Sequence, residues 1–128
     1  MDIPDDAPLF TLNGLKMSAR VTDVYDGDTV KVIFKFKDIF YKWNCRLLGI
    51  DTPEIRTKNL KEKEFGLKTR DFLRSEILNK IVTVKCYEFD KYGRLLVNIY
   101  MNDVCINDKL IQHGYAKKYD GGTKTKWF

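Results

Sequence analysis

The segment at residues 30–36 constrains the fold most, because apolar and other side chains alternate along it without a break. The even positions hold Val30, Val32, Phe34 and Phe36, and the positions between them hold Lys31, Ile33 and Lys35. Successive side chains of a strand point to opposite faces, so this pattern predicts a half-buried strand. The Asp26-Gly27 dipeptide before it favours a tight hairpin to a preceding strand that carries Ala19 and Val21.

The rest of the chain adds three strands and two helices in a fixed order. A third strand over 41–50 ends at Thr52-Pro53, because proline cannot continue a ladder. Apolar side chains at helical spacing then predict a helix over about 62–79. Strands follow at 81–89 and 95–101, and a short helix comes after them, with Asn107 as its N-cap. This order predicts an α+β, mainly β fold. It is a five-stranded OB-fold barrel with a helix between strands 3 and 4 and a short helix after strand 5.

The length of 128 residues fits one compact domain with its own core. Residues 1–16 mix Pro, Asp, Asn and Gly, which predicts an N-terminal arm. The barrel domain is expected over 17–118. Residues 119–128 are polar and contain glycine, so we expect a loose C-terminal tail there.

Charge and cysteine content narrow the class of function. The chain has 23 Lys and Arg against 18 Asp and Glu, a net charge of +5 and a pI of about 9.0. A basic domain favours polyanions such as nucleic acids. Three cysteines without a Cys-x-x-Cys pair, and a single histidine, form no recognisable zinc site.

The N-terminus predicts where the protein resides. It is acidic and lacks an apolar run, so no secretory signal is recognised, and no stretch reaches membrane-spanning length. We therefore expect a cytoplasmic or otherwise intracellular monomer without membrane contact. Export by another route, or removal of a leader, stays open.

Three short strings carry the chemistry: Asp26-Gly27-Asp28-Thr29, the run 46–54 (Arg-Leu-Leu-Gly-Ile-Asp-Thr-Pro-Glu) and Asp90-Lys91-Tyr92-Gly93-Arg94. They supply carboxylates for a hard divalent cation and two arginines, whose planar guanidinium groups match phosphate oxygens. Such a set can hydrolyse a phosphodiester with a metal and without histidine.

Each string also has a plainer interpretation. Asp-Gly and Tyr-Gly pairs are usually turns, and a lysine-rich loop is usually a solvated face. The spacing of Arg46 and Asp51 adds a difficulty, because five positions along a regular strand place two side chains on opposite faces. A bulge at Gly49 would turn Asp51 back toward Arg46.

Taken together and in this order, the three strings resemble the staphylococcal (micrococcal, or thermonuclease-like) nuclease family, from about residue 19 to 116. The resemblance implies an OB-fold and Ca²⁺-dependent cleavage of DNA and RNA with little base specificity, leaving 3′-phosphate ends. One departure is the C-terminal region, which does not look like the third helix usual in the family.

The resemblance also implies roles for individual residues. Asp28 and Asp51 are implied as metal carboxylates, and Thr52 as a metal ligand through its main-chain carbonyl. Glu54 is implied as the residue that acts on the attacking water, with Arg46 and Arg94 on the phosphate. Implied substrate contacts are Lys91 and Tyr92 at a terminal phosphate, and Tyr115, with Tyr119 as the other available tyrosine, near the nucleotide.

Two other functions remain open at this point. One is a nuclease-like module that binds nucleic acid or protein without catalysis, although the metal, acid and arginine positions are all filled with the family's functional residue types. The other is a plain OB-fold single-strand binder, which uses basic grooves and aromatic stacking. Three carboxylates at the groove would repel its ligand, so a calcium-dependent nuclease is the preferred prediction.

Overall fold

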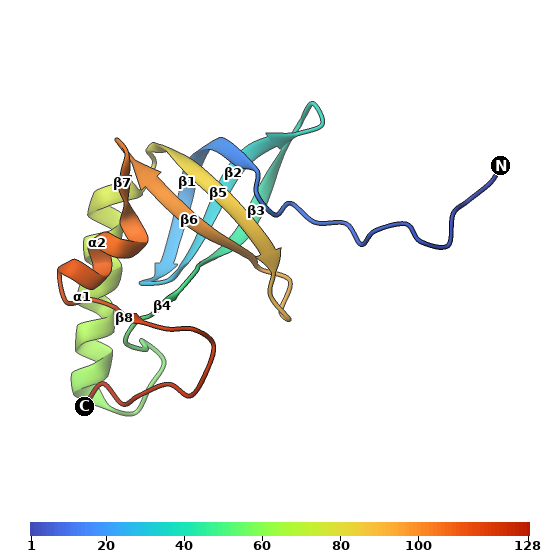
Figure 1. Cartoon of the computed structure of the whole chain (residues 1–128). Helices are drawn as coiled ribbons and strands as arrows, with labels where there is room; N and C mark the ends of the chain where they lie inside the picture. Colours follow the sequence, from blue (N-terminus) through green and yellow to red (C-terminus); the bar gives the residue numbers. More distant parts are fainter.

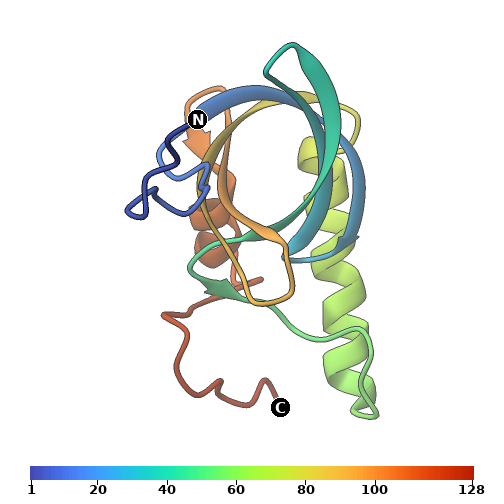
Figure 2. The same ribbon diagram turned by 90° about the vertical axis from the view of Figure 1, so that its right-hand side faces the viewer.

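The computed structural model describes residues 1–128, and its strands form a closed barrel, as predicted (Figure 1). The five barrel strands are β1 (Lys16–Asp26), β2 (Thr29–Phe36), β3 (Ile39–Leu47), β5 (Ile81–Phe89) and β6 (Leu95–Met101). They follow the sheet order β3-β2-β1-β5-β6, and a short parallel pairing of β3 with β6 closes the ring that Figure 2 shows end-on. The OB-fold prediction is confirmed.

The remaining elements lie outside the barrel ring. They are β4 (Ile50–Asp51), α1 (Leu60–Ile77), β7 (Val104–Cys105), α2 (Ile106–Gln112) and β8 (Lys117–Lys118). Both helices pack on the same side of the barrel (Figure 1). The strand β8 pairs with β4 as a separate two-stranded sheet. No helix of the structure combines the length and the apolar character needed to cross a membrane.

The alternating segment behaves as its pattern predicts. Val30, Val32 and Phe34 are fully buried inside the barrel, whereas Lys31 and Lys35 are exposed outside it. On the helix side, α1 contributes Leu73 and Ile77 to the same core. Asn59 caps this helix by accepting the Glu62 N–H, so α1 starts slightly earlier than predicted.

The predicted cap of α2 is wrong. Cys105 occupies the N-cap position and Asn107 lies buried in the first turn. Its side chain accepts the Ile99 N–H at 3.1 Å and donates to the carbonyls of Leu48 and Val97. The amide is therefore used inside the protein, where it satisfies main-chain groups at the point where β3 leaves β6.

Burial also explains the cysteines. Cys45 and Cys86 are buried in the barrel core, and Cys105 is half-buried. Burial raises the pKa of the Cys45 thiol to about 12 and that of Cys86 to about 11. These two thiols stay protonated at neutral pH and act as apolar core groups.

The two ends of the chain differ in how they contact the barrel. The first residues are exposed and extend away from it (Figure 1). Contact begins at Phe10, which packs edge-on against Phe36, and Leu12 is buried, while Gly14 donates its N–H to the Cys86 carbonyl. Residues 119–128 form no helix or strand, yet they fold back across β4 (Figure 1).

Candidate functional site

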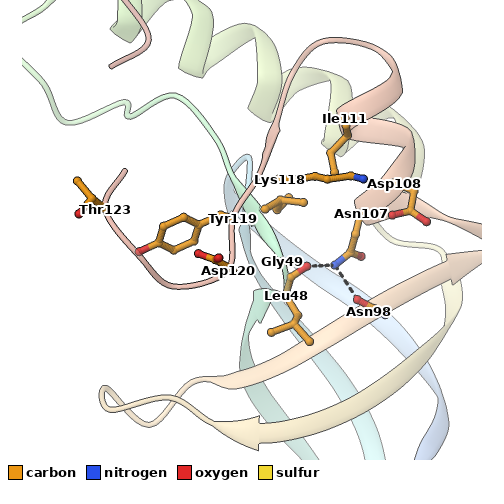
Figure 3. Close-up of a pocket in the computed structure, with 11 residues that line it drawn as sticks. Leu48, Gly49, Asn98, Asn107, Asp108, Ile111, Lys118, Tyr119, Asp120 and Thr123 are labelled. Carbon is orange, nitrogen blue, oxygen red and sulfur yellow. Dashed lines mark hydrogen bonds between the residues drawn. The ribbon is translucent and has the colours of Figure 1, made fainter. Parts of the chain in front are cut away.

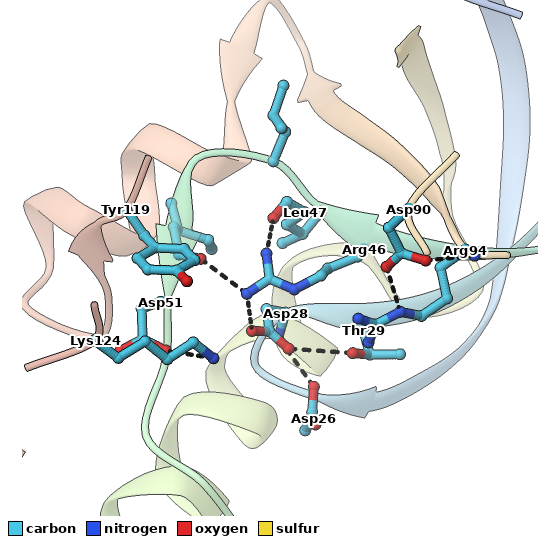
Figure 4. Close-up of polar contacts among 12 residues, drawn as sticks. Asp26, Asp28, Thr29, Arg46, Leu47, Asp51, Asp90, Arg94, Tyr119 and Lys124 are labelled. Atoms are coloured by element: carbon cyan, nitrogen blue, oxygen red, sulfur yellow. Dashed lines mark hydrogen bonds and ion pairs between the residues drawn. The ribbon is translucent and has the colours of Figure 1, made fainter. Parts of the chain in front are cut away.

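Asp28 lies in the β1–β2 turn with Gly27, and this turn packs closely against α1 and Thr52. A Cβ on Gly27 would lie 2.5 Å from the Thr69 Cγ2 of α1 and 3.1 Å from Thr52, so only glycine fits without displacement. The Asp28 carboxylate accepts the Thr29 hydroxyl at 3.1 Å and lies 3.2 Å from Arg46 Nη2 (Figure 4). The turn thus sets an acidic group beside Thr52 and Arg46.

The Asp28 carboxyl is under electrostatic strain. Burial, and after it the neighbouring Asp26, raise its pKa to about 6, although Arg46 and Thr29 act in the opposite direction. One guanidinium is therefore not enough to compensate the negative charge of this site. An additional cation would favour the ionised carboxylate.

The strand that carries Arg46 is interrupted by a turn before it reaches Asp51. Gly49 has φ +79°, and the strand resumes only at Ile50. This short turn points the Ile50 carbonyl back at Arg46 Nη2, at 3.3 Å, while Nη1 donates to the Leu47 carbonyl at 3.1 Å. The structure has a turn at Gly49 where a bulge was predicted, and the group that it brings to Arg46 is the Ile50 carbonyl, not the Asp51 carboxylate.

Asp51 is only 5% exposed, and the C-terminal tail supplies its polar partners. Lys124 Nζ lies 3.4 Å from Oδ1, and the Trp127 indole N–H donates to Oδ2 at 3.3 Å. The next residue, Thr52, is also buried. Sequence reasoning missed both tail residues, since nothing in a polar tail pattern indicates that it returns to β4.

Glu54 is held against the start of α1. Its N–H donates to Glu62 Oε2 at 2.8 Å, and a Cβ on Gly66 would lie 2.9 Å from its carbonyl oxygen. Burial raises the pKa of the Glu54 carboxyl, Lys124 lowers it, and the carboxylates of Asp28, Asp51 and Glu62 raise it further. Asp28, Asp51 and Glu54 therefore share one electrostatic environment.

These donors fit an oxygen-preferring divalent cation. The structure contains no group of three or more His, Cys, Asp or Glu side chains arranged as a metal cage. The predicted ligand set needs only two of them, Asp28 and Asp51, plus the Thr52 main-chain carbonyl. Hard oxygen ligands of this kind suit Ca²⁺ or Mg²⁺ and not thiophilic metals. The incompletely compensated charge of Asp28 is consistent with such an ion.

Arg94 is presented by the loop between β5 and β6. Gly93 has φ +80°, which closes the turn, and Arg94 Nε donates to Asp90 Oδ2 at 2.8 Å. Neither terminal nitrogen of Arg94 has a hydrogen-bond partner in the protein, so both remain available to a ligand. Although burial alone would raise the pKa of Asp90, hydrogen bonds from Arg94 and from the Tyr92 N–H keep it below its ordinary value.

A cavity of about 580 Å³ joins the two arginines. Its walls come from the β3–β4 turn, the β5–β6 loop and the tail, and they include Arg46, Gly49, Asp90, Lys91, Tyr92, Arg94, Tyr119 and Lys124. The exposed Tyr92 ring packs under Lys91 and Arg94 by cation–π contacts of 5.2 and 5.4 Å. Four basic residues line this cationic cavity against two acidic ones, Asp90 and Asp120, so its net charge is positive.

The structure does not bring Tyr115 to this cavity. Its ring stacks on Phe72 at 4.7 Å and lies 5.8 Å from Phe65, so it packs on the inner side of α1. Tyr119 lines the cavity instead. Of the three substrate contacts implied by the resemblance, Lys91 and Tyr92 lie beside the arginines and Tyr115 does not.

A second cavity, of about 480 Å³, lies between α2 and the tail (Figure 3). Asn107 contributes to its wall, but the amide is already bonded to the Leu48 carbonyl and to Asn98. No arginine lines this cavity. Its one basic residue is Lys118, against Asp108 and Asp120, so it lacks the arginines and the net positive charge that the first cavity offers to a phosphate.

Comparison with known proteins is consistent with this geometry. Residues 44–126 match the family described as staphylococcal nuclease homologue. An uncharacterised protein of Methanocaldococcus jannaschii is 34% identical over 124 residues, which cover 78% of this chain and 58% of the relative.

Two further relatives have names that refer to nucleases. An uncharacterised endonuclease of Escherichia coli O157:H7 is 33% identical, over 79% of this chain and 60% of its own length. A thermonuclease of Staphylococcus hyicus is 31% identical, over 82% of this chain and 61% of its own length. The chain thus spans about three fifths of the length of the curated relatives it matches.

Proposed function

The chain belongs to the staphylococcal nuclease family, and on that premise we propose that it is a calcium-dependent nuclease that hydrolyses phosphodiester bonds of DNA and RNA. One observation supports the proposal above all. Carboxylates of Asp28, Asp51 and Glu54 act on one another at the end of the barrel where Arg46 and Arg94 line a single cavity. An anionic ester and a divalent cation would both find complementary charge there.

Asp28, Asp51 and the Thr52 carbonyl are the groups that would hold the cation. When bound, Ca²⁺ supplies positive charge to a phosphoryl oxygen and a place for the attacking water. The protein's own contribution is to keep Asp28 and Asp51 in position through the packed Gly27 turn and the β4–β8 pairing.

Glu54 would accept the proton of the attacking water. A raised pKa suits a general base, since it brings the group closer to working pH. The water oxygen bonds to phosphorus, and the bond from phosphorus to the 5′ oxygen breaks. The leaving oxygen takes a proton from solvent. The products are a 3′-phosphate and a 5′-hydroxyl.

The two arginines would stabilise charge that develops on the phosphoryl oxygens. Arg46 also donates to the carbonyls of Leu47 and Ile50, so these two bonds keep it in place when the cation takes the Asp28 carboxylate. Arg94 is fixed at Nε by Asp90, and its two terminal nitrogens, which have no protein partner, are free for a ligand in the cavity that it lines. This is the fork geometry that recognises phosphate.

Cleavage of plasmid DNA, single-stranded DNA and RNA tests the proposal. We expect cleavage with Ca²⁺, none with a chelator, and products that carry a 3′-phosphate. Glu54→Gln should lower kcat at least about a hundredfold. The matched control is Glu64→Gln, an exposed α1 residue paired only with Lys68, which should cleave at the parent rate.

One observation favours a second function, a binding module without catalysis. Lys124 and Trp127 occupy both oxygens of Asp51, as they would in a site that no metal enters. Such a module would bind labelled single-stranded DNA with Ca²⁺, Mg²⁺ or Mn²⁺ and cleave it with none of them. That result would reject the nuclease proposal.

A further inference from the structure

The last residues of the chain have a defined position over the acidic end of β4. The Tyr119 N–H donates to the Gly49 carbonyl at 2.9 Å, which aligns the tail with the β3–β4 turn. Further along, Lys117 Nζ donates to the Lys126 carbonyl at 2.8 Å and lies 4.3 Å from the centre of the Trp127 ring. Trp127 also packs edge-on against Phe65 of α1. These contacts fasten the tail on both sides of Lys124.

Lys124 stands where two cavities meet. It lines the cationic cavity with Arg46 and Arg94, and it also lines a smaller cavity of about 200 Å³ with Asp51 and Glu54. No other residue is common to both. Its side chain is 43% exposed and its amino group lies 3.4 Å from Asp51 Oδ1 (Figure 4).

In this position the Lys124 amino group competes with a divalent cation for the Asp51 carboxylate. A divalent cation held by Asp51 and the Lys124 ammonium need the same carboxylate, and two positive charges so close together repel each other. A lysine has a flexible four-carbon stem, so its head can move while the tail stays in place. The cavity that Lys124 already lines is the space open to it, and there a phosphate offers the negative charge that Asp51 no longer provides.

We propose that Lys124 is a substrate-binding residue of this site, a third cation for the phosphate that rests on Asp51 until a divalent cation takes that carboxylate. The proposal rests on the proposed nuclease function and adds a residue from outside its three motifs. It also gives the ordered tail a role, which is to hold this amino group at the boundary between the acidic and the cationic cavities.

Three variants of the full chain test it. Lys124→Met removes the charge, Lys124→Arg keeps it, and Lys16→Met removes the same charge from an exposed position at the end of β1 away from the Asp28 turn. At saturating Ca²⁺, Lys124→Met should lower kcat/KM for a short single-stranded DNA by about tenfold or more, mainly through KM. Lys124→Arg should recover most of this loss, and Lys16→Met should stay within about twofold of the parent.

Metal binding without substrate provides a second readout. Calorimetric titration with Ca²⁺ should give a Kd at least about threefold lower for Lys124→Met than for the parent, because no ammonium has to leave Asp51. An unchanged kcat/KM would overturn the proposal, and so would a weaker Ca²⁺ affinity in Lys124→Met.

Failure of the proposed function can be told apart from failure of this inference. If the parent chain cleaves nothing, the nuclease proposal fails. The affinity of a fluorescein-labelled oligonucleotide in the presence of Ca²⁺ then decides the role of Lys124. Weaker binding by Lys124→Met than by Lys16→Met supports a phosphate contact, and equal binding rejects it.

Discussion

Two carboxyl groups of this site, those of Asp28 and Glu54, lie in surroundings that disfavour their ionised form. Asp28 is nearly buried, with Asp26 beside it and one guanidinium to balance both. Glu54 is influenced by three other carboxylates. A core designed for stability alone would not gather these groups, so their cost in folding free energy points to a ligand that compensates it.

Asp28→Asn should therefore stabilise the protein when no metal is present. The pKa of Asp28 is about 6 in the folded state and 3.8 as its ordinary value, so the folded state binds the proton more tightly. Stability falls as pH rises through this window, by up to about 3 kcal/mol at pH 7. Urea unfolding in a chelator should show a gain of about 1–3 kcal/mol for Asp28→Asn at pH 7 that disappears near pH 4.

The exposed Asp5→Asn is the control, and it should show no such gain at any pH. A variant Asp28→Asn that is less stable than the parent at pH 7 would contradict the raised pKa.

Substitutions of the two arginines should have different effects. Loss of Arg94 should lower activity alone, whereas loss of Arg46 should lower both activity and stability. Arg94→Ala should lower kcat about a hundredfold or more, about 3 kcal/mol, with little change in Tm. Arg46→Ala should lose comparable activity. It should also lose stability, because the carbonyls of Leu47 and Ile50 lose a donor in a half-buried site.

Steady-state kinetics and thermal unfolding of both variants check this difference. If Arg94→Ala cleaves at the parent rate, Arg94 is not part of the proposed site. An unchanged Tm in Arg46→Ala would show that its main-chain contacts contribute nothing to stability.

At the scale of elements, the site depends on close approach of the β1–β2 turn and the loop after β4 to α1. Two glycines make this approach possible. Gly27 faces Thr69 and Thr52, and Gly66 faces the main chain of Pro53 and Glu54. The helix thus serves as a template against which both acidic segments are positioned.

Gly27→Ala should destabilise the protein by about 1–3 kcal/mol, since its Cβ would lie 2.5 Å from Thr69 Cγ2. Thr69→Ser removes that methyl group and keeps the hydroxyl that donates to the Phe65 carbonyl. Urea unfolding of the single and double variants should show that Thr69→Ser offsets part of the cost of Gly27→Ala. Simple additivity of the two changes would show that the predicted clash is not the cause.

At the scale of the whole molecule, positive charge is concentrated where the substrate would enter. The chain carries a net charge of +5, and Arg46, Lys91, Arg94 and Lys124 line one cavity. Phosphate contacts of this kind release counterions, so affinity depends on salt.

At fixed Ca²⁺, log(kcat/KM) for single-stranded DNA should fall linearly with log[NaCl], with a slope of about −2 to −3 for three or four phosphate contacts. Lys124→Met should make the slope shallower by about 0.7. A rate that does not depend on salt would mean that these cations do not face the nucleic acid.

The alternation at 30–36, the order of the five strand patterns and the helical spacing before Ile77 were sufficient to predict the barrel and its main helix. These patterns reflect local backbone geometry and burial, which a sequence expresses directly. Asn107 shows where such reasoning stops. An asparagine near a helix start usually caps it, and here its side chain bonds main-chain groups of β6 and of Leu48, just after β3, instead.

By itself, the sequence determined the order of elements, the excess of basic charge and the identity of the acidic and arginine side chains. Only the tertiary structure decided that Gly49 turns Ile50 back onto Arg46, that Tyr115 packs on α1, and that Lys124 and Trp127 reach Asp51. The physical reason is the separation along the sequence over which each effect acts. Periodicity and turn chemistry act over a few residues, whereas Asp51 and Trp127 are 76 positions apart and meet only because the packed barrel brings the tail across β4.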